Sequence, residues 1–299
     1  MTAAADLLVV MQNWPRPVFV AIDGALLPDV PGLTAKADVF PRSLFVEQSD
    51  PTTVQAGPWF ASLDERHLES LMRIEGIEMS AVFWGGPVEE STIFRHLRSI
   101  NLVDVPRPTD APFDPFAADP ETVLFRHWDP SVMALTLPVL EPAQRARLFG
   151  PMDSLALYDP SLGGSRDAKR RIDWPEPTRG RIRISKTQLA SIAAAMTDRS
   201  RRTIATFLRD AAPTETAYMD NAALDAFIAD SEISGRELGL TTERGLSRWS
   251  YLMLISNGAI ATIEPARAFL AAKPGTPDER IGRLMLGVAD ELGRRRSPA

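Results

Sequence analysis

The chain has three histidines, His67, His96 and His127, and histidine is the side chain best suited to acid–base chemistry near neutral pH. His127 lies two residues before Asp129, and a histidine oriented by a carboxylate could act as a general base. On a strand, however, alternate residues share a face whether or not they react. A base of this kind also needs a nucleophile within hydrogen-bond reach, and the sequence marks none. A hydrolase that uses His127 and Asp129 is therefore an alternative interpretation and not the leading one.

Motifs for other kinds of chemistry are missing from the sequence. There is no cysteine, which excludes disulfides, thiolate metal sites and cysteine nucleophiles. The histidine spacings do not match a usual zinc site, and no phosphate-binding or nucleophile-elbow motif occurs. His96 lies beside Arg95 and Arg98 and is expected on the polar side of a helix. We predict no catalytic residues, no metal site and no cofactor, and a protein that is not an enzyme.

The composition is that of a globular protein, with 299 residues of which 44% are hydrophobic and 24% charged. The N-terminus lacks a basic region and carries Asp6, which argues against a signal peptide, and the most apolar stretch, 251–263, is too short to span a bilayer. We expect a cytoplasmic protein with no membrane partner. Residues 1–160 hold 11 basic and 22 acidic side chains, a balance of −11, and residues 161–299 hold 22 and 17, a balance of +5. The acidic half argues against nucleic acid as a partner.

Residues 1–160 are predicted to form a mixed α/β lobe with a central sheet. Short apolar runs bounded by turn residues are typical of buried strands, and apolar residues at helical spacing predict helices. The strands are expected at 18–22, 43–47, 79–84, 101–105, 122–127 and 154–158, and the helices at 64–75 and 87–100, with two short helical stretches between Pro130 and Phe149. Residues 106–120 hold five prolines and are expected to form a long surface loop.

The rest of the chain changes character twice. Residues 161–184 are rich in glycine, proline and arginine and are predicted to be a linker or crossing segment, with a short strand at 181–184. Residues 185–299 have helical periodicity and two capping boxes, Ser185 with Gln188 and Thr276 with Glu279. The sequence therefore predicts an α+β protein: a mixed α/β lobe followed by an all-α lobe.

The run VLFRHWDP, 123–130, places Arg126 among large apolar side chains. A buried guanidinium must find an anion or carbonyl oxygens. Asp129 is near enough to pair with it and can also cap a helix opened by Pro130. We interpret the run as a structural lock at a strand end. Its motif residues are Phe125, Arg126, Trp128, Asp129 and Pro130.

This run resembles the phenylalanine-arginine-aromatic-aspartate-proline motif of the type VI secretion effector chaperones, a family of adaptor proteins. Further segments resemble the same family in the same order: 18–26, 57–64, 79–84 followed by 87–103, 147–152, and a helical tail at 239–258. One departure is the proline-rich stretch 106–120, where the family usually has a short turn.

The resemblance implies a two-lobed adaptor without catalytic residues. Such a protein binds a toxic effector before secretion and helps to mount it on the valine-glycine-repeat (VgrG) spike or the PAAR tip.

An aromatic side chain at a strand or turn is more often part of the core than of an interface, but four could anchor a partner: Trp59, Trp84, Phe113 and Phe116. A second alternative is that the chain is itself a toxin domain.

Overall fold

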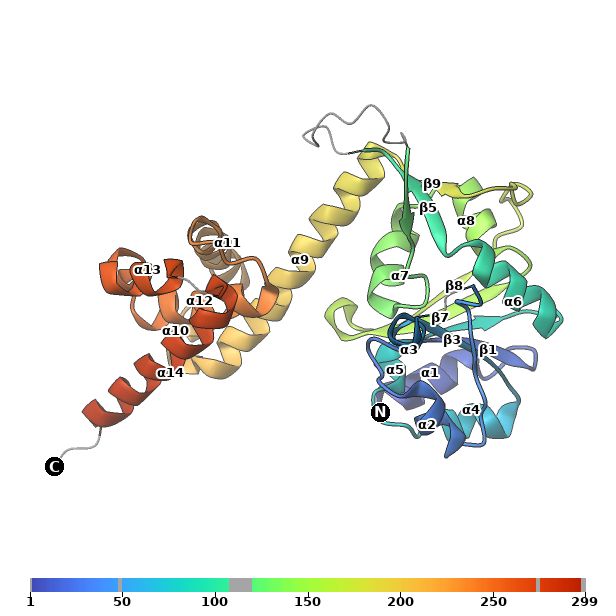
Figure 1. Cartoon of the computed structure of the whole chain (residues 1–299), viewed down its shortest axis with the longest axis horizontal. Helices are drawn as coiled ribbons and strands as arrows, with labels where there is room; N and C mark the ends of the chain where they lie inside the picture. Colours follow the sequence, from blue (N-terminus) through green and yellow to red (C-terminus); the bar gives the residue numbers. More distant parts are fainter. Residues whose placement is uncertain (1, 48–49, 108–119, 273–274, 297–299) are drawn as a thin grey trace. The chain divides into compact units, whose positions relative to one another are not determined.

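The computed structural model of the chain describes residues 2–47, 50–107, 120–272 and 275–296 (Figure 1). The structure divides into two compact units, Met1–Ala195 and Met196–Ala299. Each unit has a hydrophobic core of its own. None of the helices in these ranges is both long enough and apolar enough to cross a bilayer.

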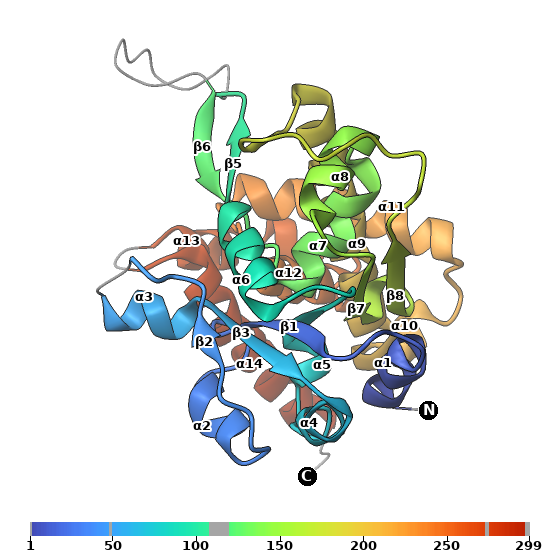
Figure 2. The same ribbon diagram turned by 90° about the vertical axis from the view of Figure 1, so that its right-hand side faces the viewer.

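An antiparallel sheet of six strands forms the centre of the first unit (Figure 2). Its two middle strands, β1 and β4, are buried along their whole length. The predicted strands at 18–22 and 154–158 are confirmed as β1 and β7. In sheet order the strands are β2 (Arg42–Ser43), β3 (Pro58–Leu63), β1 (Val18–Asp23), β4 (Ala81–Gly85), β7 (Ser154–Asp159) and β8 (Gly164–Lys169).

Helices cover both faces of this sheet, which explains why its middle strands are continuous apolar runs. Successive side chains of β1 point to opposite faces, so that Phe19 joins one core cluster and Val20 the other. The cluster with Phe19 includes side chains of α6 (Glu90–Ser99), α7 (Pro130–Thr136) and α8 (Pro142–Phe149). The cluster with Val20 includes side chains of α1 (Ala3–Met11), α2 (Val30–Ala35), α4 (Glu65–Leu71) and α5 (Ile77–Ser80).

A second sheet of three strands belongs to the same unit, in the order β6-β5-β9. Figure 2 shows its strands β6 and β5 side by side. β5 (Leu102–Val105) pairs antiparallel with β6 (Glu121–Leu124) and parallel with β9 (Ile182–Arg183). Val103 and its partner Ile182 point into the core beside Phe19. The outward side chains of this sheet are therefore the neighbours of Val103 and Ile182 along each strand.

Two predicted strands of the six-stranded sheet differ from the structure. Of 43–47 only Ser43 is in a strand, because the Ser43 hydroxyl accepts the Phe45 amide at 3.0 Å and turns the chain. The segment predicted as a strand at 79–84 starts in α5, where the Ser80 hydroxyl donates to the Gly76 carbonyl at 2.9 Å. The short segments that complete this unit are α3 (Pro51–Ala56) and two 3₁₀ turns, η1 (Leu137–Val139) and η2 (Pro160–Leu162).

Residues 161–184, expected to be a linker or crossing segment, supply β8 and β9 to the two sheets. The short strand expected at 181–184 is present as β9. The long helix α9 (Lys186–Ala211) follows at once, and the boundary between the units falls inside it. Leu189 and Ile192 in its first turns pack on the core of the first unit, whereas Ile204 and Leu208 belong to the core of the second.

The second unit consists of helices in its described residues. Its core surrounds Trp249, and Gly235 lets α11 lie close to this ring, since a Cβ there would be 2.9 Å from Trp249 Cδ1. Its helices are the end of α9, α10 (Pro213–Thr216), α11 (Asn221–Glu237), α12 (Glu243–Ile255), η3 (Ala259–Thr262), α13 (Glu264–Ala271) and α14 (Pro277–Arg296). The α+β fold class predicted from the sequence is confirmed.

Both predicted capping boxes are present. At the start of α9 the Ser185 hydroxyl accepts the Gln188 amide at 3.2 Å, and the Gln188 side chain accepts the Ser185 amide at 2.9 Å. Gln188 also donates to the Val139 carbonyl at 2.9 Å, so the box ties the helix start to the first unit. The box at Thr276 and Glu279 has amide-to-oxygen distances of 2.8 and 3.3 Å.

The first box gives a stability prediction. Ser185→Ala removes one of its two hydrogen bonds and is expected to lower the free energy of unfolding by about 1 kcal/mol. Ser191→Ala, at an exposed position inside the same helix, is the matched control and should change it by no more than a few tenths of a kcal/mol. Urea unfolding followed by circular dichroism measures both, and equal effects of the two substitutions would contradict the role given to Ser185.

Candidate functional site

The run 123–130 ends β6 and begins α7. β6 stops at Leu124, earlier than the predicted strand at 122–127. The Phe125 amide donates to the Asn101 carbonyl at 2.8 Å, and the Asp129 amide then closes a turn on the Arg126 carbonyl at 3.0 Å. Phe125 is buried in the core of the first unit next to this turn. Arg126 reaches Asp23, at the end of β1 in the six-stranded sheet.

Arg126 contacts two carboxylates. Its guanidinium lies 2.6 Å from Asp23 Oδ2 and 3.2 Å from Asp129 Oδ2. The contact with Asp129 is the one that the sequence predicts. Burial is reversed from the expectation, because the side chains of Asp23 and Asp129 are 0% and 8% exposed and that of Arg126 is 39% exposed. The carboxylates are thus the buried charges, and the guanidinium covers them from the solvent side.

Asp23 is the partner that sequence reasoning missed, because 103 positions separate it from Arg126. Its other carboxylate oxygen accepts the Ala25 amide at 2.9 Å. Gly24 is required beside it, since a Cβ at this position would lie 2.0 Å from the Gln55 carbonyl oxygen. An aspartate followed by glycine at the end of a wholly apolar strand was the one signal in the sequence for this position.

Asp129 has two roles at once. One carboxylate oxygen accepts the Ser131 amide at 2.8 Å and so caps α7, whose first residue is Pro130. The other oxygen faces Arg126. Burial raises the pKa of Asp129, the Arg126 charge and the Ser131 amide oppose this, and the negative charge of Asp23 adds to it.

The pKa of Arg126 depends on its burial and on the two carboxylates, Asp23 and Asp129. Burial alone would lower the pKa of the guanidinium, but the hydrogen bond to Asp23 and the charges of both carboxylates outweigh it and raise the pKa. The three charges therefore form one interacting cluster, in which the loss of Arg126 would leave two buried carboxylates close together.

His127 and Asp129, the pair that could have served a hydrolase, have different partners. His127 is completely buried, and its Nε2 lies 2.9 Å from Asn101 Oδ1. The ring also packs edge-on against Trp128 at a centroid distance of 5.0 Å. Burial lowers the pKa of His127 to about 3, so the ring is neutral at physiological pH.

His96 corrects another expectation, because it is not on the polar side of its helix. Its Nε2 lies 2.8 Å from the Leu148 carbonyl oxygen. Gly150 makes room for the ring: its φ is +55°, and a Cβ there would lie 2.2 Å from His96 Cε1. Burial lowers the pKa of His96 to about 4, against the opposing effect of the hydrogen bond to Leu148.

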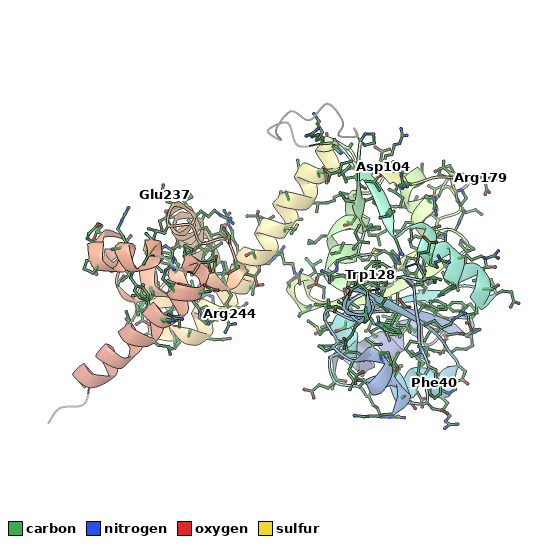
Figure 3. The ribbon with its side chains drawn as sticks, in the orientation of Figure 1. Phe40, Asp104, Trp128, Arg179, Glu237 and Arg244 are labelled. Atoms are coloured by element: carbon green, nitrogen blue, oxygen red, sulfur yellow. The ribbon has the colours of Figure 1, made fainter. Side chains whose placement is uncertain are left out.

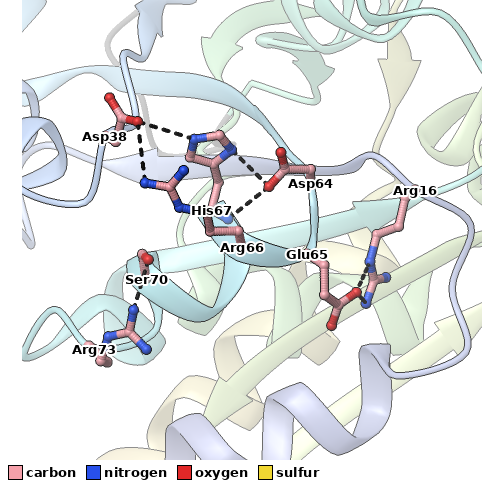
Figure 4. A network of polar contacts seen from close by, with 8 residues as sticks. All are labelled: Arg16, Asp38, Asp64, Glu65, Arg66, His67, Ser70 and Arg73. Carbon is pink, nitrogen blue, oxygen red and sulfur yellow. Dashed lines mark hydrogen bonds and ion pairs between the residues drawn. The ribbon is translucent and has the colours of Figure 1, made fainter.

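His67 lies in a surface network at the start of α4 (Figure 4). Its Nδ1 is 2.8 Å from Asp64, which caps the helix, and its Nε2 is 3.7 Å from Asp38. The hydrogen bond from the His67 amide lowers the pKa of Asp64. The ring contacts recorded for His67 in the described residues are to carboxylates and include no hydroxyl nucleophile. No group of three or more acidic or histidine side chains in those residues is placed to hold a metal ion.

The four aromatic candidates for partner binding differ in burial where the structure describes them. Trp84 is fully buried in the core, since β4 lies in the middle of the sheet, and it presents no surface to a partner. Trp59 is half-buried on β3 and donates from Nε1 to the Gln55 carbonyl at 3.2 Å, so its role in partner binding stays a prediction. Phe113 and Phe116 lie outside the described residues. Trp128 of the motif is buried inside the first unit (Figure 3).

Comparison with known families bears on this same region. Residues 18–147 match the family model described as Domain of unknown function (DUF4123). This family is an adaptor-type domain associated with type VI secretion. The match covers less than half of the 299 residues, and no curated protein and no solved structure matched the chain.

The DUF4123 match includes β1 with Asp23 and the motif with Arg126 and Asp129, so all three members of the charge cluster fall inside it. The segments 18–26, 57–64 and 87–103, which carried the resemblance, also fall inside. The helical tail at 239–258 lies outside the match, and its resemblance to the family stays a prediction.

The charge cluster predicts a structural effect for Arg126→Ala. Removing the guanidinium leaves two buried carboxylates, and we expect the free energy of unfolding to fall by about 3 kcal/mol, at the low end for a broken buried pair because Arg126 is 39% exposed. Arg66→Ala, with a side chain that is 79% exposed, is the control and should cost less than about 0.5 kcal/mol. An unchanged melting temperature in Arg126→Ala would rule out the lock.

The buried histidines predict acid sensitivity. The unfolded chain protonates His96 and His127 near their ordinary pKa of about 6.5, whereas the folded protein holds them neutral down to about 4 and 3. Unfolding therefore takes up protons in this window. The stabilisation is complete above about pH 6.5 and is lost as the pH falls toward the folded pKa values.

The measurement is urea unfolding at several values between about pH 7.5 and 4.5. His96→Gln and His127→Gln should each reduce the slope of unfolding free energy against pH. Leu97→Ala is the control, because Leu97 is buried next to His96 on α6 and does not titrate. It should lower the free energy of unfolding and leave its slope against pH unchanged. A slope that is the same in all four proteins would show that the two rings titrate alike in the folded and unfolded chains.

Proposed function

We propose that this protein is an adaptor of type VI secretion, which binds a toxic effector and promotes its loading onto the VgrG spike or the PAAR tip before secretion. The observation that carries the proposal is the DUF4123 match over residues 18–147, in a family associated with type VI secretion. The adaptor does not catalyse a reaction and is not itself secreted.

The contacts of the titratable groups support a binding role over a catalytic one. Asp129 is occupied by Arg126 and by the start of α7, and His127 is buried against Asn101 with a pKa of about 3. A general base must accept a proton near the working pH and reach its substrate. His127 meets neither condition, because its pKa is about 3 and its ring is completely buried. The structural interpretation of the motif is therefore favoured over the catalytic one.

The proposal is tested with the genes that neighbour this one. The full chain is co-expressed with the encoded effector and with the VgrG or PAAR protein, and complexes are detected by size-exclusion chromatography. In the bacterium, deletion of the gene should abolish secretion of the effector, and the wild-type gene should restore it. The adaptor itself should be absent from the secreted fraction.

Two results would overturn the proposal. Secretion of every neighbouring effector at the wild-type level after deletion would show that the protein is not needed for loading. Growth arrest caused by the chain expressed alone, and cured by a neighbouring immunity gene, would instead make it a toxin.

A further inference from the structure

The outer face of the small sheet exposes two leucines side by side. Leu102 on β5 and Leu124 on β6 are directly paired across the strands, and they are 40% and 51% exposed. Their neighbours Val103 and Val123 point the other way, into or against the core. A directly opposed pair of exposed leucines forms one continuous apolar strip across the two strands.

Arginines cross this same face. Arg181 precedes β9, and its guanidinium lies 3.6 Å from Asp104 on β5 and 3.3 Å from the Thr122 hydroxyl on β6. Arg183 lies 4.0 Å from the same Asp104 and is 82% exposed. Two guanidiniums thus share one carboxylate, which is itself only 13% exposed. Because Arg181 is 50% and Arg183 82% exposed, the face keeps an excess of positive charge that is accessible from solvent.

The leucines and Arg181 line a common hollow of about 640 Å³, which is also lined by Phe45, Val46 and Arg98. A second hollow of about 350 Å³ is also lined by Arg181, together with Arg147 and Arg179. Arg147 is held by the carbonyl oxygens of Ser99 and Gly180 at 3.0 and 2.8 Å. The two hollows meet at Arg181, so the apolar and the basic surfaces are continuous.

The charge of this face contrasts with the sequence around it. Residues 1–160 have a balance of −11, whereas residues 161–184 hold seven basic and three acidic side chains, a balance of +4. The structure places part of this basic segment, Arg179 to Arg183, against the otherwise acidic lobe. A local surface of opposite sign steers a partner of complementary charge to one place and one orientation.

We infer that the outer face of β6-β5-β9, with Leu102, Leu124, Arg98, Arg181 and Arg183, binds an acidic segment of a partner protein that presents leucine-like side chains between carboxylates. The inference rests on the proposed function and adds to it the chemistry of the segment that the adaptor recognises. Carboxylates of the segment pair with the guanidiniums, and its apolar side chains cover the leucine strip. Arginine suits this role because its planar fork binds a carboxylate through two parallel hydrogen bonds.

Nucleic acid is the other polyanion that a basic face could bind. The leucine strip gives a phosphate backbone no favourable contact, and Asp104 and Glu47 in the same surface would repel it. An acidic peptide differs from nucleic acid because its apolar side chains bury the leucines, while its carboxylates lie at the guanidiniums and away from the two acids. The two ligands are separated by the test below.

The test uses the full chain and a fluorescein-labelled peptide, Glu-Leu-Glu-Leu-Glu, in fluorescence anisotropy. We expect saturable binding that weakens as salt is added, and a loss of affinity of about tenfold or more in Arg181→Glu/Arg183→Glu. The same peptide with serine for leucine, or with lysine for glutamate, should bind less tightly. Leu102→Ser/Leu124→Ser should lose the preference for leucine over serine.

Matched variants control for folding and for net charge. Arg66→Glu/Arg73→Glu makes the same change of charge on the α4 network, and it should keep the wild-type affinity (Figure 4). Arg181→Gln/Arg183→Gln removes the charges without adding repulsion for Asp104, and it should fold with a melting temperature near that of the wild type and still bind weakly. Equal binding by the Arg66/Arg73 and Arg181/Arg183 glutamate variants would overturn the inference. A labelled oligothymidine that binds more tightly than the peptide, through the same arginines, would overturn it as well.

The same variants applied to the effector and spike proteins separate this inference from the proposed function. If these proteins bind the wild type and all the face variants equally, and the peptide does not bind, the docking face is wrong and the adaptor function stands. If neither protein binds the wild type while the peptide result is as expected, the adaptor function fails and the docking face stands.

Discussion

Asp23 and Asp129 are two buried carboxylates that share the guanidinium of Arg126, and this contact joins the end of β1 to the start of α7. The burial of the carboxylates determines both the desolvation free energy that the contact costs and the strength of the attraction to Arg126. Taking a carboxylate out of water is unfavourable, so a charge at 0% exposure persists only when a cation and amides meet it. Arg126 supplies the cation, and the Ala25 and Ser131 amides supply the hydrogen bonds.

The rest of the first unit depends on this arrangement. Because Asp129 closes a turn on Arg126, the flanking Phe125 and Trp128 enter the core instead of continuing a strand. The turn also brings His127 to Asn101, at the beginning of β5. The ionic contact and this backbone turn together set the path of the chain between the small sheet and the helices, which accounts for the order of aromatic, basic and acidic residues in the run 123–130.

The sequence predicted the features that depend on near neighbours. The apolar strands 18–22 and 154–158, both capping boxes and the Asp129 cap of α7 are all local patterns, and all are present. Contacts between distant positions were not predictable in the same way. Asp23 was missed as the partner of Arg126, and β3 and β8 were not predicted as elements, since their places depend on sheet pairing and not on their own periodicity. His96 was assigned to the surface because Gly150, which admits its ring, lies far along the chain.

The surface chemistry of the small sheet follows from its register. β9 pairs Ile182 with Val103, and this pair completes the core. Because side chains alternate along a strand, burying Ile182 forces Arg181 and Arg183 to the outer face, beside Asp104 and the leucine pair. A shift of one residue in the pairing of β9 would bury the guanidiniums of Arg181 and Arg183 and expose Ile182. Such a register is unfavourable because the apolar core offers the guanidiniums no partners. The packing that stabilises the first unit is thus the same constraint that places a basic and apolar surface on an acidic lobe.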